Sequence, residues 1–242
     1  MATLAENPGG DPVSSEQRER RFFMGMAIAI AVAVALGFGA YAVLGISSFG
    51  APWWVHVHAF TFVGWIALYL NQNRLIVRGE VAQHRRMGRL MAAWAVWMTV
   101  VGFSTLVLNT ATHRTPPIFT PVFIMTLDAL NLVLFLMLLA GGLALRRQTD
   151  WHRRLMLSAT VCLIAPALGR IAVVSGGFSL IKIAAMQLAF IAVAMVRDWR
   201  VLGRIHPAYC WGAAAILALA VLVGPLAGLA PVAVLSDAIA AK

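Results

Sequence analysis

Charged residues are scarce in this sequence, and their scarcity excludes most soluble folds. Only 12% of the 242 residues are charged, and only nine are acidic, whereas a soluble domain usually carries about 25% charged residues. So few charges cannot cover a water-facing surface. The hydrophobic content of 61% and the mean hydropathy of +0.84 are instead typical of an integral membrane protein.

Cysteine pairs and the common catalytic motifs are also missing. The two cysteines, Cys162 and Cys210, fall inside apolar runs and form no CxxC pair, which argues against a disulfide framework or a cysteine metal site. The sequence has no HxxxH or HExxH zinc motif, no phosphate loop, no Ser-His-Asp elbow and no dinucleotide motif. No catalytic class is indicated, and we expect a protein other than an enzyme.

Long apolar runs dominate what the sequence does contain. A helix crosses a bilayer in about 20 residues, and none of the runs shows the two-residue alternation of a membrane barrel strand. The sequence predicts an all-α integral membrane bundle of about seven transmembrane helices, in one domain over residues 22–231. The expected spans are 22–44, 54–76, 90–110, 120–145, 155–175, 179–197 and 208–231.

The segments on either side of this domain differ from it in composition. Residues 1–21 are polar without an apolar period and predict a disordered cytoplasmic tail, while 232–242 predict a short external tail. The stretch ERRFFMG resembles a twin-arginine export signal. The apolar run that follows is long enough to span a bilayer, so we expect an uncleaved first helix.

Basic residues are distributed unevenly among the gaps between the spans. The formal net charge of +10 could indicate a nucleic-acid partner, but the basic residues lie in short gaps between apolar runs, which is the pattern of topology signals. The positive-inside rule predicts a cytoplasmic N-terminus and an external C-terminus. Seventeen of the nineteen basic residues are arginine, which indicates a GC-rich bacterial genome. We therefore expect a bacterial inner-membrane protein that contacts lipid and no nucleic acid.

Ionisable residues inside the spans are costly in hydrocarbon and therefore mark the first places to look for function. Asp128 and Asn131 fall in the fourth span and Arg170 in the fifth. We expect an Asp128–Arg170 ion pair, which would either line a substrate, quinone or proton site or fix the packing of the helices. Pro166 lies one turn before Arg170 and predicts a kink there.

The second span has a polar stripe. His58, Trp65 and Gln72 are spaced by seven residues and share one helical face. Such a stripe can also serve as polar contact between helices. Together with Asp128, Asn131 and Arg170, these three residues form the predicted intramembrane polar site.

Six histidines fall at two predicted depths. His56, His58 and His113 are expected on the external side, and His84, His152 and His206 on the cytoplasmic side. Two such layers suggest haem b held by paired histidines, provided that the pairs face each other at one depth. The candidate ligands for haem or a metal are His58, His84, His152 and His206.

Similar sequence fragments open three of the predicted helices. His-Arg-Arg is shared by AQHRRMGRL and TDWHRRLML, and Asp-Trp by TDWHRRLML and RDWRVLGRIHPAY. These matches indicate either an internal repeat or three segments that each anchor a helix in the same way. With HAFTFVGW and the helix-embedded arginine of LIAPALGRI, residues 54–175 resemble uncharacterised bacterial multipass membrane families of unknown function. A looser likeness to cytochrome b561-type bundles rests on the histidines near both faces.

The predicted activity is correspondingly broad. The pattern favours a membrane accessory or assembly protein, or one that binds or transports a small molecule. Its partners would be lipid, other membrane proteins or a small hydrophobic ligand. The alternative is a redox membrane protein linked to haem b or quinone.

Overall fold

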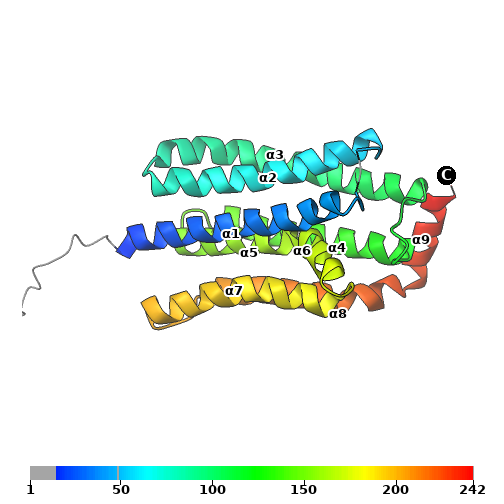
Figure 1. The fold of residues 1–242 in the computed structure, drawn as a ribbon. Coiled ribbons are helices and arrows are strands. Elements are labelled where there is room, and N and C mark those ends of the chain that lie inside the picture. Colours follow the sequence, from blue (N-terminus) through cyan, green and yellow to red (C-terminus); the bar gives the residue numbers. More distant parts are fainter. Residues whose placement is uncertain (1–14, 48, 242) are drawn as a thin grey trace, which may run out of the picture.

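The computed structural model describes residues 15–47 and 49–241, and every regular element within these ranges is a helix (Figure 1). In chain order the elements are α1 (Ser15–Val43), α2 (Trp53–Val77), α3 (Val81–Ala111), α4 (Pro121–Ala144), α5 (Thr149–Leu163), α6 (Ala165–Val174), α7 (Leu180–Leu202), α8 (Ala208–Ala227) and α9 (Ala230–Ala240). The predicted all-α bundle is confirmed.

Six helices in the described part of the chain, α1, α2, α3, α4, α7 and α8, are long and apolar enough to cross a membrane. The pair α5 and α6 bends by 45° and makes a seventh span when counted as one segment. These helices overlap the segments expected from the sequence, although α1 begins at Ser15 rather than 22 and α3 at Val81 rather than 90. The fold is compatible with a multipass membrane protein.

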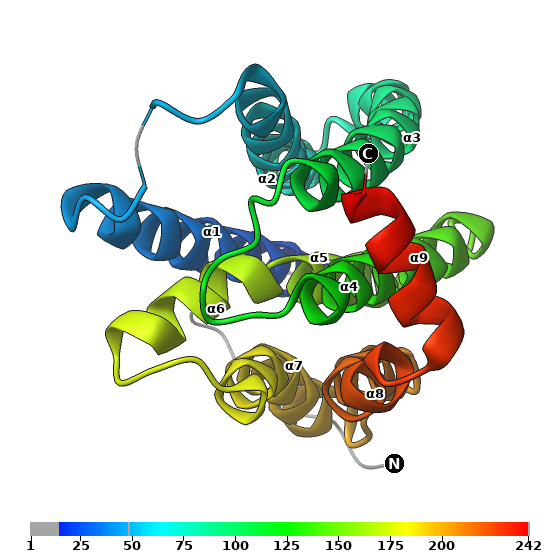
Figure 2. The ribbon, with the colours of Figure 1, turned by 90° about the vertical axis from the view of Figure 1, so that its right-hand side faces the viewer.

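The long helices run side by side along the length of the molecule, with α4 in the middle of the end-on view, while α9 lies across one end (Figure 1 and Figure 2). Helix α4 packs against α5 and α8, while α1 packs against α2 and α6. Every residue from Arg154 to Ala165 is buried. Helix α5 is therefore surrounded by protein along most of its length.

Both predicted tails differ from the structure. Helix α1 begins at Ser15, so the expected disorder of residues 1–21 is wrong for its last seven residues, and the remaining positions lie outside the described residues. Glu19 within this extension binds arginines of two other helices, which explains why it is helical. The expected C-terminal tail contains α9, whose apolar sequence APVAVLSDAIA packs on α3 and α4.

Glycines allow two close helix approaches. A Cβ atom on Gly37 of α1 would overlap the backbone carbonyl of Ala167 on α6, lying 2.9 Å from its carbon. A Cβ atom on Gly212 of α8 would lie 2.5 Å from the hydroxyl of Ser158 on α5. Small residues at helix contacts allow backbones to approach closely, which is how helices associate without a hydrophobic driving force.

The chain breaks between α5 and α6, at Ile164. Pro166 follows the break, as the predicted kink required, and its missing N–H frees carbonyl oxygens at the end of α5. The side-chain amide of Gln187 on α7 donates to two of them, Val161 O at 2.9 Å and Cys162 O at 3.0 Å. The buried amide replaces helical hydrogen bonds that the break removes.

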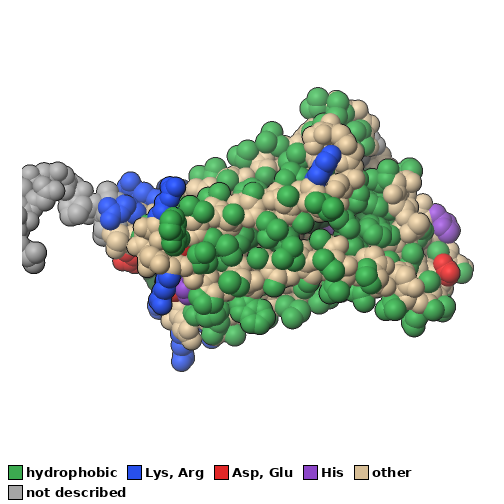
Figure 3. Space-filling model, turned by 90° about the horizontal axis from the view of Figure 1, so that it is seen from below, with side chains coloured by type: hydrophobic (Ala, Val, Ile, Leu, Met, Phe, Trp, Pro, Cys, Tyr) green, Lys and Arg blue, Asp and Glu red, His purple; other side chains and the backbone are tan. Residues whose placement is uncertain are grey.

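Charge is concentrated at one end of the bundle. The arginine-rich segments at the start of α1 and at the α2–α3, α4–α5 and α7–α8 connections lie together there (Figure 1). Figure 3 shows most of the basic side chains of one face gathered at that end, with hydrophobic side chains over the remaining length. We call this the basic end, and the other the opposite end.

Candidate functional site

Asp128 projects from the face of α4 that points into the bundle. Residues at spacings of three, four and seven share one side of a helix. Of those around Asp128, Met125, Asn131, Leu132 and Phe135 are buried, Ile124 is half-buried and Pro121 is exposed. Asp128 itself is exposed, so it lies where the buried face of α4 gives way to exposed residues nearer the start of the helix.

Arg170 lies on α6, six residues after the break. Its guanidinium stacks over the ring of Phe38 at 4.1 Å and lies 5.3 Å from that of Tyr41, both on α1. Its Nη1 donates to Pro166 O at 2.9 Å. Its buried Nε has no hydrogen-bond partner in the described part of the chain.

Asp128, Arg170 and His58 form one electrostatic group. Arg170 interacts through its charge with both of the other residues, yet the ion pairs found among the described residues do not include Asp128–Arg170. The expected direct ion pair is absent from this arrangement, because the guanidinium is held on the aromatic rings of α1.

His58 completes this group from α2. Its ring stacks on Phe62 with centroids 4.3 Å apart, and its buried Nδ1 lacks a hydrogen-bond partner among residues 15–47 and 49–241. We call His58, Asp128 and Arg170 the polar triad. Its members come from three helices, and two of them have buried nitrogen atoms that no described protein group satisfies.

The other predicted members of the site lie elsewhere. Trp65 is fully buried and packs edge-on against Phe135, with ring centroids 5.1 Å apart. Asn131 accepts a hydrogen bond from the thiol of Cys162 at 3.4 Å. Gln72 lies about four turns of α2 from His58, toward the basic end. The predicted six-residue site therefore divides into the polar triad and residues that pack helices together.

Gln72 instead contacts His84, the first member of a histidine pair. In the orientation that satisfies its amide, its nitrogen donates to the backbone oxygen of His84 at 3.2 Å and faces Nδ1, while its oxygen accepts from Gly88 N–H at 2.9 Å. The rings of His84 and His152 are edge-on, with centroids 6.4 Å apart. Nδ1 of His152 is 2.8 Å from Gly142 O.

His206 and His58 do not join this pair. His206 lies against Trp151, with ring centroids 4.9 Å apart, and its Nδ1 accepts from the Ala208 N–H at 3.2 Å. Burial, followed by the nearby Arg154 guanidinium, lowers the pKa of His206. Within the described residues, no three His, Cys, Asp or Glu side chains are placed to hold a metal ion.

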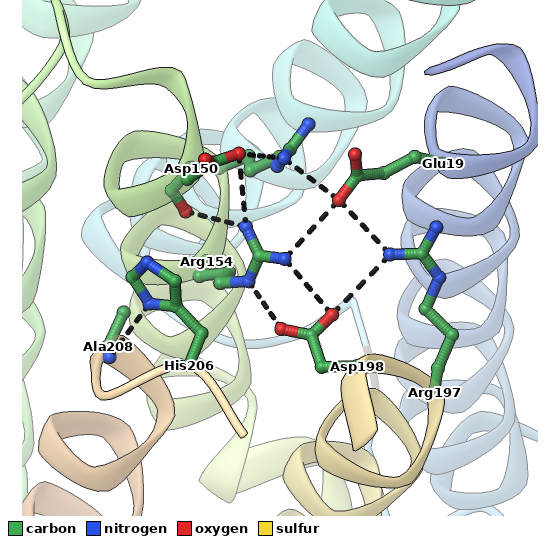
Figure 4. Close-up of polar contacts among 8 residues, drawn as sticks. Glu19, Asp150, Arg154, Arg197, Asp198, His206 and Ala208 are labelled. Carbon is green, nitrogen blue, oxygen red and sulfur yellow. Dashed lines mark hydrogen bonds and ion pairs between the residues drawn. The ribbon is translucent and has the colours of Figure 1, made fainter. Parts of the chain in front are cut away.

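The basic end also contains a buried ionic cluster that the sequence analysis missed (Figure 4). Arg154 and Asp198 are both fully buried, with Nε–Oδ2 and Nη2–Oδ1 distances of 2.7 and 3.0 Å. Glu19 accepts from Arg154 at 3.3 Å and from Arg197 at 3.0 Å. Fork-to-fork contact with a carboxylate is the strongest geometry that arginine offers.

Arg153 and Asp150 complete this ionic cluster. Arg153 lies 2.9 Å from Glu19 and also contacts Asp150. Three arginines thus meet three carboxylates, and the cluster joins α1, α5 and α7 without net charge. The arginines had been explained by topology alone. The informative residues were the acids, since Asp198 is one of only nine in the chain and lies near the end of an apolar helix.

Comparisons with known proteins add no family to this description. No family model matches the chain, and the searches of curated proteins and of solved structures found no significant match. The fold and its sites define an all-helical bundle, compatible with a multipass membrane protein, that has a polar triad inside and an ionic cluster at its basic end.

Proposed function

We propose that the chain is a multipass protein of the bacterial inner membrane that binds, and in this way transports or senses, a small polar molecule at the polar triad. The basic end would face the cytoplasm, because basic segments are retained on that side. The six or seven apolar helices belong to the fold, whereas the bacterial inner membrane and the binding activity are what we propose.

The single observation that carries the proposal is unmet polar capacity inside the bundle. His58 Nδ1 and Arg170 Nε are buried without partners among the described residues, and Asp128 is exposed beside buried residues of α4. A buried polar group without a hydrogen bond costs roughly 1–3 kcal/mol. A molecule that hydrogen-bonds Arg170 and His58 would remove that cost, and a donor group on it could also bind Asp128.

The broken helix supports the same proposal. Non-helical backbone at membrane depth is tolerated where protein or a water-lined cavity satisfies it, and discontinuous helices form the central sites of many transporters. Here the break at Ile164 is fully enclosed, and Arg170 follows it on α6. The break therefore places a cation on a short, separate helix, where its guanidinium lies against α1.

Access to the triad can be measured with a cysteine at position 128. We expect Asp128→Cys, in a Cys210→Ser background, to react with a membrane-impermeant thiol reagent added to the outside of intact cells. Val133→Cys is the matched control, since Val133 lies on the outward face of the same helix with 42% exposure and should face lipid. An unreactive Asp128→Cys refutes the accessible site, while a reactive Val133→Cys refutes the membrane placement of α4.

Ligand binding can be tested with defined probes. Amino acids carry a carboxylate suited to Arg170 and an ammonium group suited to Asp128, so we expect at least one of the twenty to raise the melting temperature of the purified protein. Saturation to 100 times Kd adds about 2.7 kcal/mol of stability. Arg170→Gln should abolish the shift and Arg114→Gln should not. Absence of any shift would exclude this class of ligand.

A second candidate function rests on His84 and His152. Two imidazoles on opposite sides of one metal place their ring centroids roughly 6 Å apart, from metal–nitrogen bonds of about 2 Å, and the observed separation is 6.4 Å. Both Nδ1 atoms contact protein groups, as is usual for metal-bound histidine. No third protein ligand is placed nearby among the described residues, so the group proposed for this pair is haem, which brings four nitrogens of its own.

Visible absorption separates the two candidate functions. A haem protein purified from cells supplied with haem shows a Soret band, and His84→Ala or His152→Ala should remove it. If the wild-type protein shows no such band, the haem function is excluded. The ligand-binding function is tested separately, by the thiol labelling and the melting-temperature shifts described above.

A further inference from the structure

An open groove runs along the outside of the bundle between α1 and α7, toward the basic end. It encloses about 610 Å³. Its lining is apolar, with Phe22 of α1 and Ala189, Ala192 and Val196 of α7, apart from Arg197 and Arg200 toward its basic end. The groove is separate from the polar triad and the histidine pair, and neither proposed function uses it.

The shape of the groove matches a lipid chain. Its α7 residues follow one another at spacings of three and four and so form one stripe of the helix. At 1.5 Å per residue, the distance from Ala189 to Arg200 is about 17 Å, which is close to half of the roughly 30 Å hydrocarbon thickness of a bilayer. The two alanines leave room that larger side chains would fill.

The charges at the end of the groove are unequal. Arg197 is engaged, since its Nη1 lies 3.0 Å from Glu19 and 3.4 Å from Asp198, and its guanidinium stacks over Phe22 at 5.1 Å. Arg200 is exposed, and no ion pair formed within residues 15–47 and 49–241 includes it. Because the neighbouring ionic cluster is neutral, Arg200 supplies the uncompensated positive charge.

We infer that this groove holds one anionic phospholipid of the leaflet at the basic end, with an acyl chain along α7 and its phosphate at Arg200. Basic pockets between helices on the cytoplasmic side bind anionic headgroups. A second copy of the chain fits less well, because a parallel symmetric pair would bring two basic ends together. The inference rests on the membrane placement in the proposed function but is independent of ligand binding at the polar triad.

Native mass spectrometry tests the inference directly. Wild-type protein in detergent is incubated with phosphatidylglycerol or with phosphatidylcholine of the same acyl chains. We expect one phosphatidylglycerol to be retained in preference to phosphatidylcholine. Arg200→Gln should lower this retention about fivefold, which corresponds to about 1 kcal/mol per basic residue near the surface. Arg204→Gln removes the same charge four residues away, outside the groove, and should leave retention unchanged.

A second variant tests the apolar part of the groove. Ala192→Phe fills the chain site on an exposed surface, so it should reduce phosphatidylglycerol retention while the melting temperature stays within about 2 °C of wild type. Equal retention of the two lipids, an equal effect of Arg200→Gln and Arg204→Gln, or a lipid-free dimer that Ala192→Phe disrupts would each overturn the inference. If the protein inserts into vesicles while one of these results is obtained, the lipid inference is wrong but the proposed membrane location is still supported.

Discussion

Removal of Asp198 should destabilise this protein more than any other single loss of charge. Arg154 is fully buried and has its two best contacts with this carboxylate. Breaking a buried pair by deleting one partner costs about 3–5 kcal/mol, because the remaining charge stays buried. At about 2–4 °C per kcal/mol for a chain of this size, Asp198→Ala should lower the melting temperature by about 10 °C.

The matched control is Asp150→Asn, which changes the net charge of the ionic cluster by the same amount. The Asp150 side chain is 61% exposed, and exposed ion pairs contribute only about 0–1 kcal/mol. The melting temperature, followed by tryptophan fluorescence of the purified protein in detergent, should therefore fall by about 3 °C or less. Equal losses from Asp150→Asn and Asp198→Ala would show that burial does not determine the cost.

A double variant separates charge imbalance from lost packing. Arg154→Met with Asp198→Leu removes one charge of each sign and leaves the cluster neutral. Replacement of a buried pair by apolar side chains of similar size is often neutral or stabilising. The double variant should therefore be more stable than Asp198→Ala. If it is as unstable as the single variant, the reasoning from an uncompensated Arg154 is refuted.

Three further expectations follow from the packing and from one titrating group. Gly37→Ala should destabilise the protein by about 1–3 kcal/mol, as overpacking does, whereas Gly39→Ala, with open space around it, should be neutral in the same thermal melts. Gln187→Leu removes two hydrogen bonds and leaves Val161 O without its side-chain partner, since Cys162 O still accepts from the Ile164 N–H. The loss should cost about 1–3 kcal/mol, and deuterium exchange at the end of α5 should rise; unchanged exchange would contradict this role of Gln187. The lowered pKa of His206 favours its neutral form in the folded state. Its contribution to the free energy of unfolding is therefore present above the ordinary pKa of about 6.5 and is lost as the pH falls below that value. The melting temperature of wild type should drop more between pH 7.5 and 5.5 than that of His206→Gln, and equal drops would contradict this assignment.

Hydropathy was sufficient to predict the spans, because each helix must satisfy its backbone and bury about 20 apolar residues on its own. Hydropathy did not predict the helical residues that precede the first apolar run or the helix α9 that follows the last. Glu19 is polar and precedes the first apolar run, so nothing local distinguishes it from a disordered residue. Its helical state depends on arginines that come more than 130 residues later in the chain.

The candidate site was predictable only in part, because it too depends on contacts between residues that are far apart in the chain. Spacing along α2 placed His58 on an inward face, and cost in hydrocarbon singled out Asp128 and Arg170. Which of these residues meet depends on the rotation and depth of separate helices, which no local pattern contains. Gln72 shares the face of His58 but lies at the other end of the bundle, and the rings of α1 hold Arg170 away from a direct contact with Asp128.

The burial of α5 from Arg154 onward has a consequence for the order in which the protein is made. Arg154 leaves the ribosome 44 residues before its fully buried partner Asp198, so until α7 has been synthesised the growing chain can pair this arginine only with Glu19 and Asp150. The surroundings that make α5 stable are likewise completed last, by α7 and α8. Assembly must therefore close around α5 rather than build outward from it, and chains that end before residue 180 should be degraded faster than the full chain in a pulse–chase experiment.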